Sequence, residues 1–323
     1  MCSDPLRYDR KSSGPAADAG AAVRPAVVPN YARDVNPKVN RLSDLPLGIW
    51  NWWLAGLLGL LVGSFLNVVI HRLPLMLEQR WARECAELAG QPAPDQAPLS
   101  LAQPRSRCPG CGALIRWQQN IPLLSYLLLR GRCASCQAPI SWRYPLVEAL
   151  TALLFAGVVA VHGNGMAGLA GCGLAAALVA LAFIDWDTTL LPDDITLPLL
   201  WAGLIAAALG WSASSLSESL WGAVAGYLSL WLIYWAFKLA TGKEGMGYGD
   251  FKLFAALGAW FGWPALIPII LLASLSGAAV GIALKLGPGL REGGYVPFGP
   301  FLALGGLWAL LFGPERFLQW IGI

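Results

Sequence analysis

The chain has 323 residues, of which 56% are hydrophobic and only 13% are charged, and its mean hydropathy is +0.56. Soluble domains carry about 25% charged residues, so this composition excludes an ordinary soluble globular protein and favours a membrane protein. The net charge of +3 gives no reason to expect nucleic acid as a partner.

The first predicted element is a polar N-terminal arm over residues 1–45, rich in Ala, Pro, Arg and Asp and without apolar periodicity. No apolar stretch of the kind found in a cleavable signal peptide precedes residue 47. Residues 48–70 then form an apolar run that is long enough to cross a bilayer. We therefore expect the first transmembrane helix within residues 46–70.

Residues 71–145 are polar and are expected to form a small domain between the first and second transmembrane helices. This segment holds nine Arg against four acidic residues, and the positive-inside rule therefore places it in the cytoplasm. The same rule conflicts with the N-terminal arm, whose seven basic residues would lie on the opposite side.

Four of the seven cysteines of the chain lie in this domain, as two C-x-x-C pairs: Cys108, Cys111, Cys133 and Cys136. Two such pairs 21 residues apart are typical of tetrahedral zinc held by four thiolates. A site with four protein ligands has no open position, so we expect a structural zinc that stabilises a domain with little core. Redox-active dithiols are the alternative, although the surrounding sequence shows no thioredoxin-like βαβ pattern.

The remaining chain is almost continuously apolar, and residues 146–313 are predicted to form a membrane domain of seven helices, followed by a tail over residues 314–323. With the first helix this gives an all-α polytopic membrane protein of about eight transmembrane helices. Residues 251–262 form the shortest of them. The expected helices cover residues 146–161, 166–184, 195–210, 220–239, 251–262, 265–286 and 297–312.

Acidic residues beside membrane helices are costly and are candidates for function. Helix counting places five of them on the cytoplasmic side: Asp185, Asp187, Asp193, Asp194 and Asp250. Two carboxyl groups that share one proton could act together as base and acid on a peptide bond. The spacing along the chain does not itself bring Asp185 and Asp250 together.

Structural interpretations of the same residues remain open. Asp193 or Asp194 is favoured as an N-cap or first-turn acid of the next helix, and Asp187 could be a solvated charge at the interface. Asp250 could also be a first-turn acid, but three glycines precede it. Gly245, Gly247 and Gly249 would allow positive φ angles and the close approach of a substrate strand.

Other functional classes have weaker support. The chain holds only two histidines, neither near a nucleophile, which disfavours Ser-His or Cys-His catalysis. A proton-coupled transporter would need an internal repeat and acids at the membrane midplane. A zinc-stabilised membrane scaffold without catalysis is a third reading, and it predicts that both Asp185 and Asp250 are dispensable.

The cysteine pairs and the acidic motifs make the sequence resemble the bacterial type IV prepilin peptidases, a family of GxGD aspartyl proteases. The resemblance runs from about residue 50 to 312. Besides the two cysteine pairs, its motifs occupy residues 63–74, 120–122, 143–148, 184–193, 245–252 and 297–300.

The resemblance implies that Asp185 and Asp250 are the catalytic pair and that the four cysteines bind zinc. It places Asp187, Asp193, Gly247, Gly249 and Lys252 in supporting positions. It further implies a bifunctional enzyme of the bacterial inner membrane with its active site facing the cytoplasm. Such enzymes cut the leader of prepilins and of type II secretion pseudopilins after Gly.

In such enzymes the new N-terminal residue, usually Phe, is then methylated with S-adenosylmethionine, an activity attributed to the domain at residues 71–145. A peptidase without methyl transfer is the nearest alternative, and no ligand of the methyl donor can be named from the sequence. We further hypothesise that Glu148, Asp187, Asp193 and Asp194 hold the basic leader of the substrate. Besides its prepilin and pseudopilin substrates, we expect the lipid bilayer as a partner, and the sequence does not give the oligomeric state.

Overall fold

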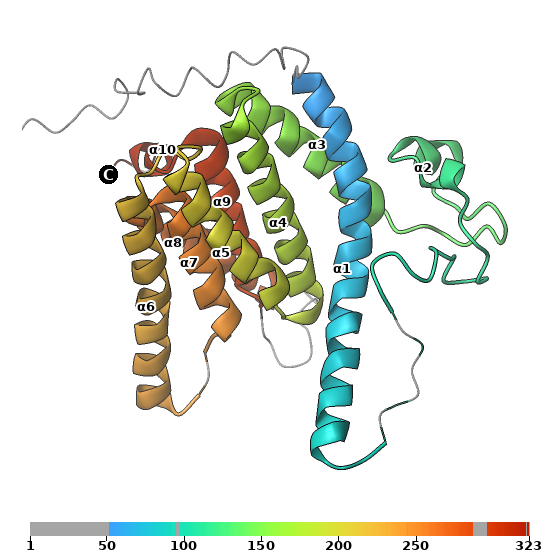
Figure 1. Cartoon of the computed structure of the whole chain (residues 1–323), viewed down its shortest axis with the longest axis horizontal. Coiled ribbons are helices and arrows are strands. Elements are labelled where there is room, and N and C mark those ends of the chain that lie inside the picture. The colour runs from blue at the N-terminus through green and yellow to red at the C-terminus, as the bar shows by residue number, and fades with distance from the viewer. Residues whose placement is uncertain are drawn as a thin grey trace, which may run out of the picture. The chain divides into compact units, whose positions relative to one another are not determined.

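The computed structural model describes residues 52–92, 94, 97, 99–243, 245–286, 296–320 and 322. The predicted arm at 1–45 and most of the predicted loop at 287–296 lie outside these residues. Within the described part the chain is helical, with two isolated β-bridges and no strand. The helices of 14 or more residues are α1 Trp52–Leu88, α3 Arg143–His162, α4 Met166–Thr188, α5 Asp193–Ala208, α6 Leu216–Thr241, α7 Tyr248–Phe261, α8 Leu266–Leu286 and α9 Gly299–Phe312 (Figure 1).

Each apolar segment predicted after residue 145 therefore contains one helix. In the described part of the chain, five helical segments are long and apolar enough to cross a membrane: α1, α3, α4, α6 and a segment that joins a short 3-10 turn to α8. Three others are shorter, with 16 residues in α5 and 14 each in α7 and α9. Ten of the 14 residues of α7 are buried, so protein surrounds most of this helix.

The first helix is longer than the sequence predicted. We expected it to end at residue 70, whereas α1 continues to Leu88 and has 37 residues. Residues 75–88 are mostly Leu, Glu, Ala and Arg, which are good helix formers, and they were read as part of a polar domain. Pro74 lies inside α1 and removes one backbone hydrogen bond, but the helix continues through it and Pro74 is buried.

Glycines allow two of the helix pairs to pack with their backbones close together. A methyl group on Gly59 of α1 would come within 2.7 Å of Ala152 Cα in α3, and one on Gly226 of α6 within 2.7 Å of the Phe254 carbonyl oxygen in α7. Gly59 and Gly63, like Gly222 and Gly226, are four residues apart and so share a helix face. This small-residue spacing is typical of close helix packing in membranes.

The polar domain between α1 and α3 is attached to both helices by buried or half-buried polar groups. The guanidinium of Arg72 donates hydrogen bonds to the carbonyl oxygens of Ser100 and Pro104, at 2.9 and 2.6 Å. A carboxylate oxygen of Glu148 accepts a hydrogen bond from the Leu123 backbone N–H at 2.8 Å. These hydrogen bonds hold the polar domain against α1 and α3. The domain contains two short helical elements, Trp117–Asn120 and α2 Leu124–Leu128.

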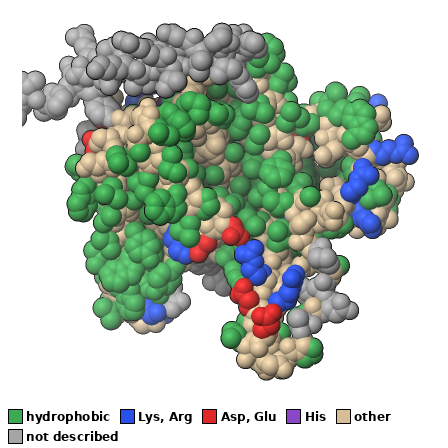
Figure 2. Space-filling model, viewed as in Figure 1, with side chains coloured by type: hydrophobic (Ala, Val, Ile, Leu, Met, Phe, Trp, Pro, Cys, Tyr) green, Lys and Arg blue, Asp and Glu red, His purple; other side chains and the backbone are tan. Residues whose placement is uncertain are grey.

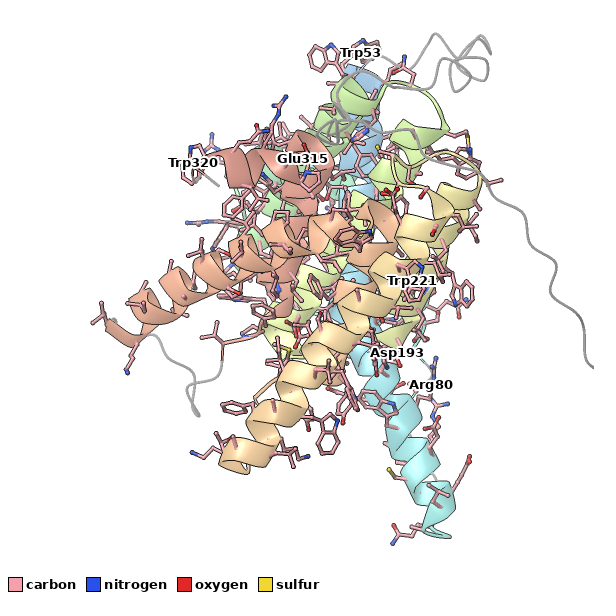
Figure 3. All side chains as sticks on the ribbon, turned by 90° about the vertical axis from the view of Figure 1, so that its left-hand side faces the viewer. Trp53, Arg80, Asp193, Trp221, Glu315 and Trp320 are labelled. Atoms are coloured by element: carbon pink, nitrogen blue, oxygen red, sulfur yellow. The ribbon has the colours of Figure 1, made fainter. Side chains whose placement is uncertain are left out.

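Charged side chains gather toward one end of the bundle. Figure 2 shows acidic and basic side chains together over the lower part of α1 and the neighbouring helix ends. In Figure 3, Arg80 and Asp193 lie toward this end, whereas Trp53 and Trp320 lie toward the other. The five predicted acids belong to the charged end, since α4 finishes there and α5 and α7 begin there.

Candidate active site

Asp185 lies in the last turn of α4, and only 5% of its surface is exposed. Its Oδ2 accepts a hydrogen bond of 3.0 Å from the backbone N–H of Gly299, the first residue of α9. The first N–H groups of a helix have no partner within the helix and carry its partial positive charge. The N-terminus of α9 therefore stabilises a carboxylate at Asp185.

Asp250 lies in the first turn of α7, and 4% of its surface is exposed. Its Oδ1 is buried and takes no hydrogen bond from any residue that the structure describes. A buried carboxyl oxygen without a donor is costly, and such an atom in a native site points to a ligand, a water or a proton. Asp250 is thus placed to hold a proton or to bind a water molecule.

The two carboxyl groups belong to the same site. Asp185 acts electrostatically on Asp250, although 65 positions separate them in the chain. Leu191 connects the elements around them, because it packs against both Gly249, just before Asp250, and Gly299. A Cβ added to Gly299 would lie 2.6 Å from Asp185 Oδ2, so only glycine leaves this carboxylate in its place.

The glycines before Asp250 serve packing, and our expectation of positive φ angles there was wrong. Gly247 has a φ of −83°, and neither Gly245 nor Gly249 is among the residues with positive φ. A Cβ on Gly249 would instead lie 2.7 Å from Leu191 Cβ, and one on Gly245 would lie 2.9 Å from the ring of Phe237. The absence of a side chain at these glycines therefore lets the backbone before Asp250 lie close to Leu191 and Phe237.

The other predicted acids are each paired with a cation or a backbone donor. Asp187 forms an ion pair of 2.5 Å with Arg143, and Asp193 forms one of 2.7 Å with Lys252. Asp194 lies 3.7 Å from Arg80, and Glu148 is bound to Leu123. Each of the four acids thus has a partner within the chain, and the hypothesis that they hold a basic substrate segment stays a prediction.

Lys252 and Asp193 have a structural place in the site. Their ion pair joins α7, just after its first turn and two residues after Asp250, to the first turn of α5. Asp193 is not an N-cap, since that position belongs to Pro192, but it is a first-turn acid as the structural reading expected. Sequence reasoning gave Gly299 and Arg143 no role, because neither a backbone N–H nor an ion pair between distant residues has a local sequence signature.

The four predicted cysteine ligands come together in the polar domain. Their Sγ atoms all lie within 4.8 Å of one another, and those of Cys108 and Cys136 are 3.8 Å apart. Four sulfurs at about 2.3 Å from a tetrahedral zinc would be about 3.8 Å apart, so the cluster fits such an ion. The two pairs also fold alike, because the N–H of Cys108 donates to Ala113 and that of Cys133 donates to Ala138.

One of these thiols is prepared for ligation. Hydrogen bonds from the backbone N–H groups of Cys136 and Ser135 lower the pKa of Cys133 from 9.0 to about 6. A thiol must lose its proton to bind metal, and the lowered pKa of Cys133 favours the thiolate, whereas hydrogen bonds with neighbouring thiols raise the pKa of Cys136. The cluster can therefore hold a metal ion.

Known proteins resemble the chain over most of its length. Residues 57–162 match the Bacterial Peptidase A24 N-terminal domain, and residues 172–282 match the Type IV leader peptidase family. No solved structure matches the chain.

Several relatives carry the name prepilin leader peptidase/N-methyltransferase. The relative from Burkholderia pseudomallei is 49% identical over 90% of this chain and 94% of its own length. The relative from Aeromonas hydrophila is 56% identical over 86% of this chain and 97% of its own length, and that from Pseudomonas aeruginosa is 54% identical over 82% and 93%. Identity at this level over nearly the whole of both chains shows that the protein belongs to the type IV leader peptidase family.

Proposed function

We propose that this protein cuts the leader peptide from type IV prepilins and type II secretion pseudopilins after Gly, and then N-methylates the new N-terminal residue. The names of its relatives and the two matching family models support both activities. The observation that carries the peptidase activity is the meeting of two buried carboxyl groups, Asp185 and Asp250, at adjoining helix termini.

The two carboxyl groups hydrolyse the peptide bond as a pair that shares one proton. The Gly299 N–H favours a carboxylate at Asp185, which we assign as the base, and the shared proton then lies on Asp250. Asp185 takes a proton from water as the water oxygen attacks the scissile carbonyl carbon, and Asp250 gives its proton to the carbonyl oxygen. When the C–N bond breaks, the proton held by Asp185 passes to the leaving amine, and Asp250 takes back a proton from one hydroxyl of the diol, which restores the starting state of the pair.

The site lies where such a bond would be presented. We assign the five membrane-length helices α1, α3, α4, α6 and α8, together with the shorter α5, α7 and α9, to about eight membrane spans in the bacterial inner membrane, with the charged end of the bundle in the cytoplasm. A prepilin has a basic leader followed by an apolar helix, so its cleavage point lies at this interface. Because α7 is surrounded by protein, a helix of 14 residues can serve at this depth without exposing its backbone to lipid.

The cysteine cluster has a structural role in this proposal. Zinc held by Cys108, Cys111, Cys133 and Cys136 would have no open coordination position and would stabilise the fold of a small domain. The methyl group would come from S-adenosylmethionine, whose sulfonium gives up a methyl group to an amine. A peptidase without methyl transfer is the competing reading, and the methylation assay described below separates the two.

The test is the cleavage of a model prepilin by purified enzyme in detergent. Asp185→Asn and Asp250→Asn should each lower kcat by about 10³-fold or more, because a lone carboxyl group cannot act as both base and acid. Glu87→Gln, which removes an exposed carboxylate from α1, is the matched control and should cleave at the wild-type rate. Normal cleavage by either Asn variant, with intact folding, would exclude the proposed pair.

A further inference from the structure

A cavity of about 290 Å³ lies on the side of α4 away from Gly299, between α1, the start of α3 and the last turn of α4. Its size is at the lower end of the roughly 300–1,000 Å³ typical of small-molecule sites. None of the groups assigned to peptide cleavage lines this cavity. Six residues define its chemistry: Ile70, Pro74, Glu78, Arg143, Tyr144 and Asp187.

One wall of the cavity is a single face of α1. Ile70, Pro74 and Glu78 are spaced four residues apart and so follow one another along the helix. Because Pro74 has no N–H, the carbonyl of Ile70 cannot receive its usual hydrogen bond from that position. The wall therefore offers an apolar surface, a backbone carbonyl available as an acceptor, and a carboxylate at its far end.

The charges around the cavity do not cancel. Arg143 forms an ion pair with Asp187, donates to the Phe183 carbonyl oxygen at 3.4 Å and lies 5.1 Å from the centre of the Phe183 ring. These contacts hold the guanidinium in place and neutralise Asp187. Glu78 is exposed, and within the described residues it has no ion-pair partner. It thus leaves the cavity with an uncompensated negative charge.

We propose that this cavity binds the methyl donor, a nucleoside that carries a sulfonium cation, with Glu78 facing the cationic part. This inference rests on the proposed methyl transfer. The half-exposed ring of Tyr144 and the apolar surface of α1 suit a flat heterocyclic base, and the Ile70 carbonyl can accept a hydrogen bond from it. An anionic nucleotide would instead meet Glu78 with like charge.

The position of the cavity relates methyl transfer to cleavage. Asp185 and Asp187 are two residues apart, which separates their directions on a helix by about 200°. Asp185 contacts the N-terminus of α9, whereas Asp187 and Thr188 line the cavity. The two sites therefore lie on opposite sides of the last turn of α4, and each can be altered without the other.

The test measures ligand binding and both reactions in the same purified proteins. Calorimetric titration compares S-adenosylmethionine with S-adenosylhomocysteine, which lacks the sulfonium charge. Glu78→Gln should weaken binding of S-adenosylmethionine about tenfold and that of S-adenosylhomocysteine much less, because a charged contact is lost. Leu75→Trp, which fills the cavity from its α1 wall, should weaken both ligands. Glu84→Gln, on α1 but outside the cavity, is the matched control.

Cleavage of a model prepilin reports folding, and mass spectrometry of the product N-terminus reports methylation. The proposal is supported if both cavity variants cleave normally while binding and methylation fall together. It is overturned if both variants bind S-adenosylmethionine as the wild type does. A wild-type enzyme that cleaves but neither binds S-adenosylmethionine nor methylates would overturn the methyl-transfer half of the proposed function, and this site with it.

Discussion

At the scale of single residues, Gly299 supports the site through having no side chain. Its N–H donates to Asp185, and the space a Cβ would fill is taken by the same carboxylate. We expect Gly299→Ala to lower kcat for prepilin cleavage by about 10- to 100-fold, because a displaced catalytic group loses its geometry. Steady-state kinetics with a model prepilin measures this.

Gly281→Ala provides the comparison for that experiment. Gly281 lies in α8, and a Cβ there would meet nothing within 4 Å. This variant should keep the wild-type rate and melt at the same or a slightly higher temperature, because Ala favours a helix over Gly by about 1 kcal/mol. Wild-type cleavage by Gly299→Ala would show that the carboxylate tolerates displacement and that our account of Gly299 is wrong.

The sequence predicted the site residues through their chemical type and their place at membrane helix ends. Asp185, Asp250 and the four cysteines could be named in this way, and the structure brings each set together. Their functions remain predictions. Gly299 could not be given a role, since any non-proline residue has an N–H and only the fold decides where it points. The paired states of Asp187, Asp193 and Asp194 also depend on residues far away in the chain.

At the scale of elements, Arg72 connects α1 to the polar domain. Replacing it with Ala removes the donors to the carbonyl oxygens of Ser100 and Pro104. Hydrogen bonds to a charged group contribute about 1.5–3 kcal/mol, so we expect amide exchange in residues 99–104 to accelerate by tenfold or more. Hydrogen–deuterium exchange with mass spectrometry measures this.

Arg83→Ala removes an exposed arginine from the same helix and should leave that exchange unchanged. In both variants the cysteine cluster should keep its capacity to bind zinc, which a zinc titration would measure, because none of the four cysteines contacts Arg72. Equal exchange in Arg72→Ala and the wild type would mean that other contacts hold the segment. The predicted end of the first helix at residue 70 was wrong because the segment after it is polar and contains Pro74. The good helix formers at residues 75–88 continue the helix to Leu88 despite that proline.

At the scale of the whole molecule, our proposal that the charged end of the bundle faces the cytoplasm rests on the positive-inside rule and can be tested by epitope insertion. An epitope inserted at Gly90, after α1, should be reached by antibody only when the cells are permeabilised. One inserted at Gly163, between α3 and α4, should be reached in intact spheroplasts. Both glycines have positive φ and open space around them, so an insertion disturbs little. The reverse pattern would invert our topology and place the carboxylates outside.

Most of the architecture could be predicted from hydropathy. A segment in the bilayer must form its backbone hydrogen bonds within itself and present apolar side chains to lipid, so a membrane helix is visible in the sequence as an apolar run. The order of the helices after residue 145 was predicted, and their ends differ by only a few residues. Which helices touch was not predictable from hydropathy, since lipid tails and leucine side chains are equally apolar. The close pairing of α6 with α7 depends on glycines such as Gly226, whose partners only the fold reveals.

The last turn of α4 separates the two proposed reactions by about one helix diameter, roughly 10 Å. If both proposals hold, a pilin cleaved at the carboxyl pair has two competing fates: its new amine reaches the cavity and is methylated, or the pilin leaves the enzyme unmethylated. The fraction of cleaved pilin that is methylated then depends on the rate of methyl transfer relative to the rate at which the pilin leaves the enzyme. It does not depend on the rate of peptide cleavage. Diluting the substrate in a larger membrane area would leave the methylated fraction unchanged, whereas slower dissociation of the cleaved pilin would raise it.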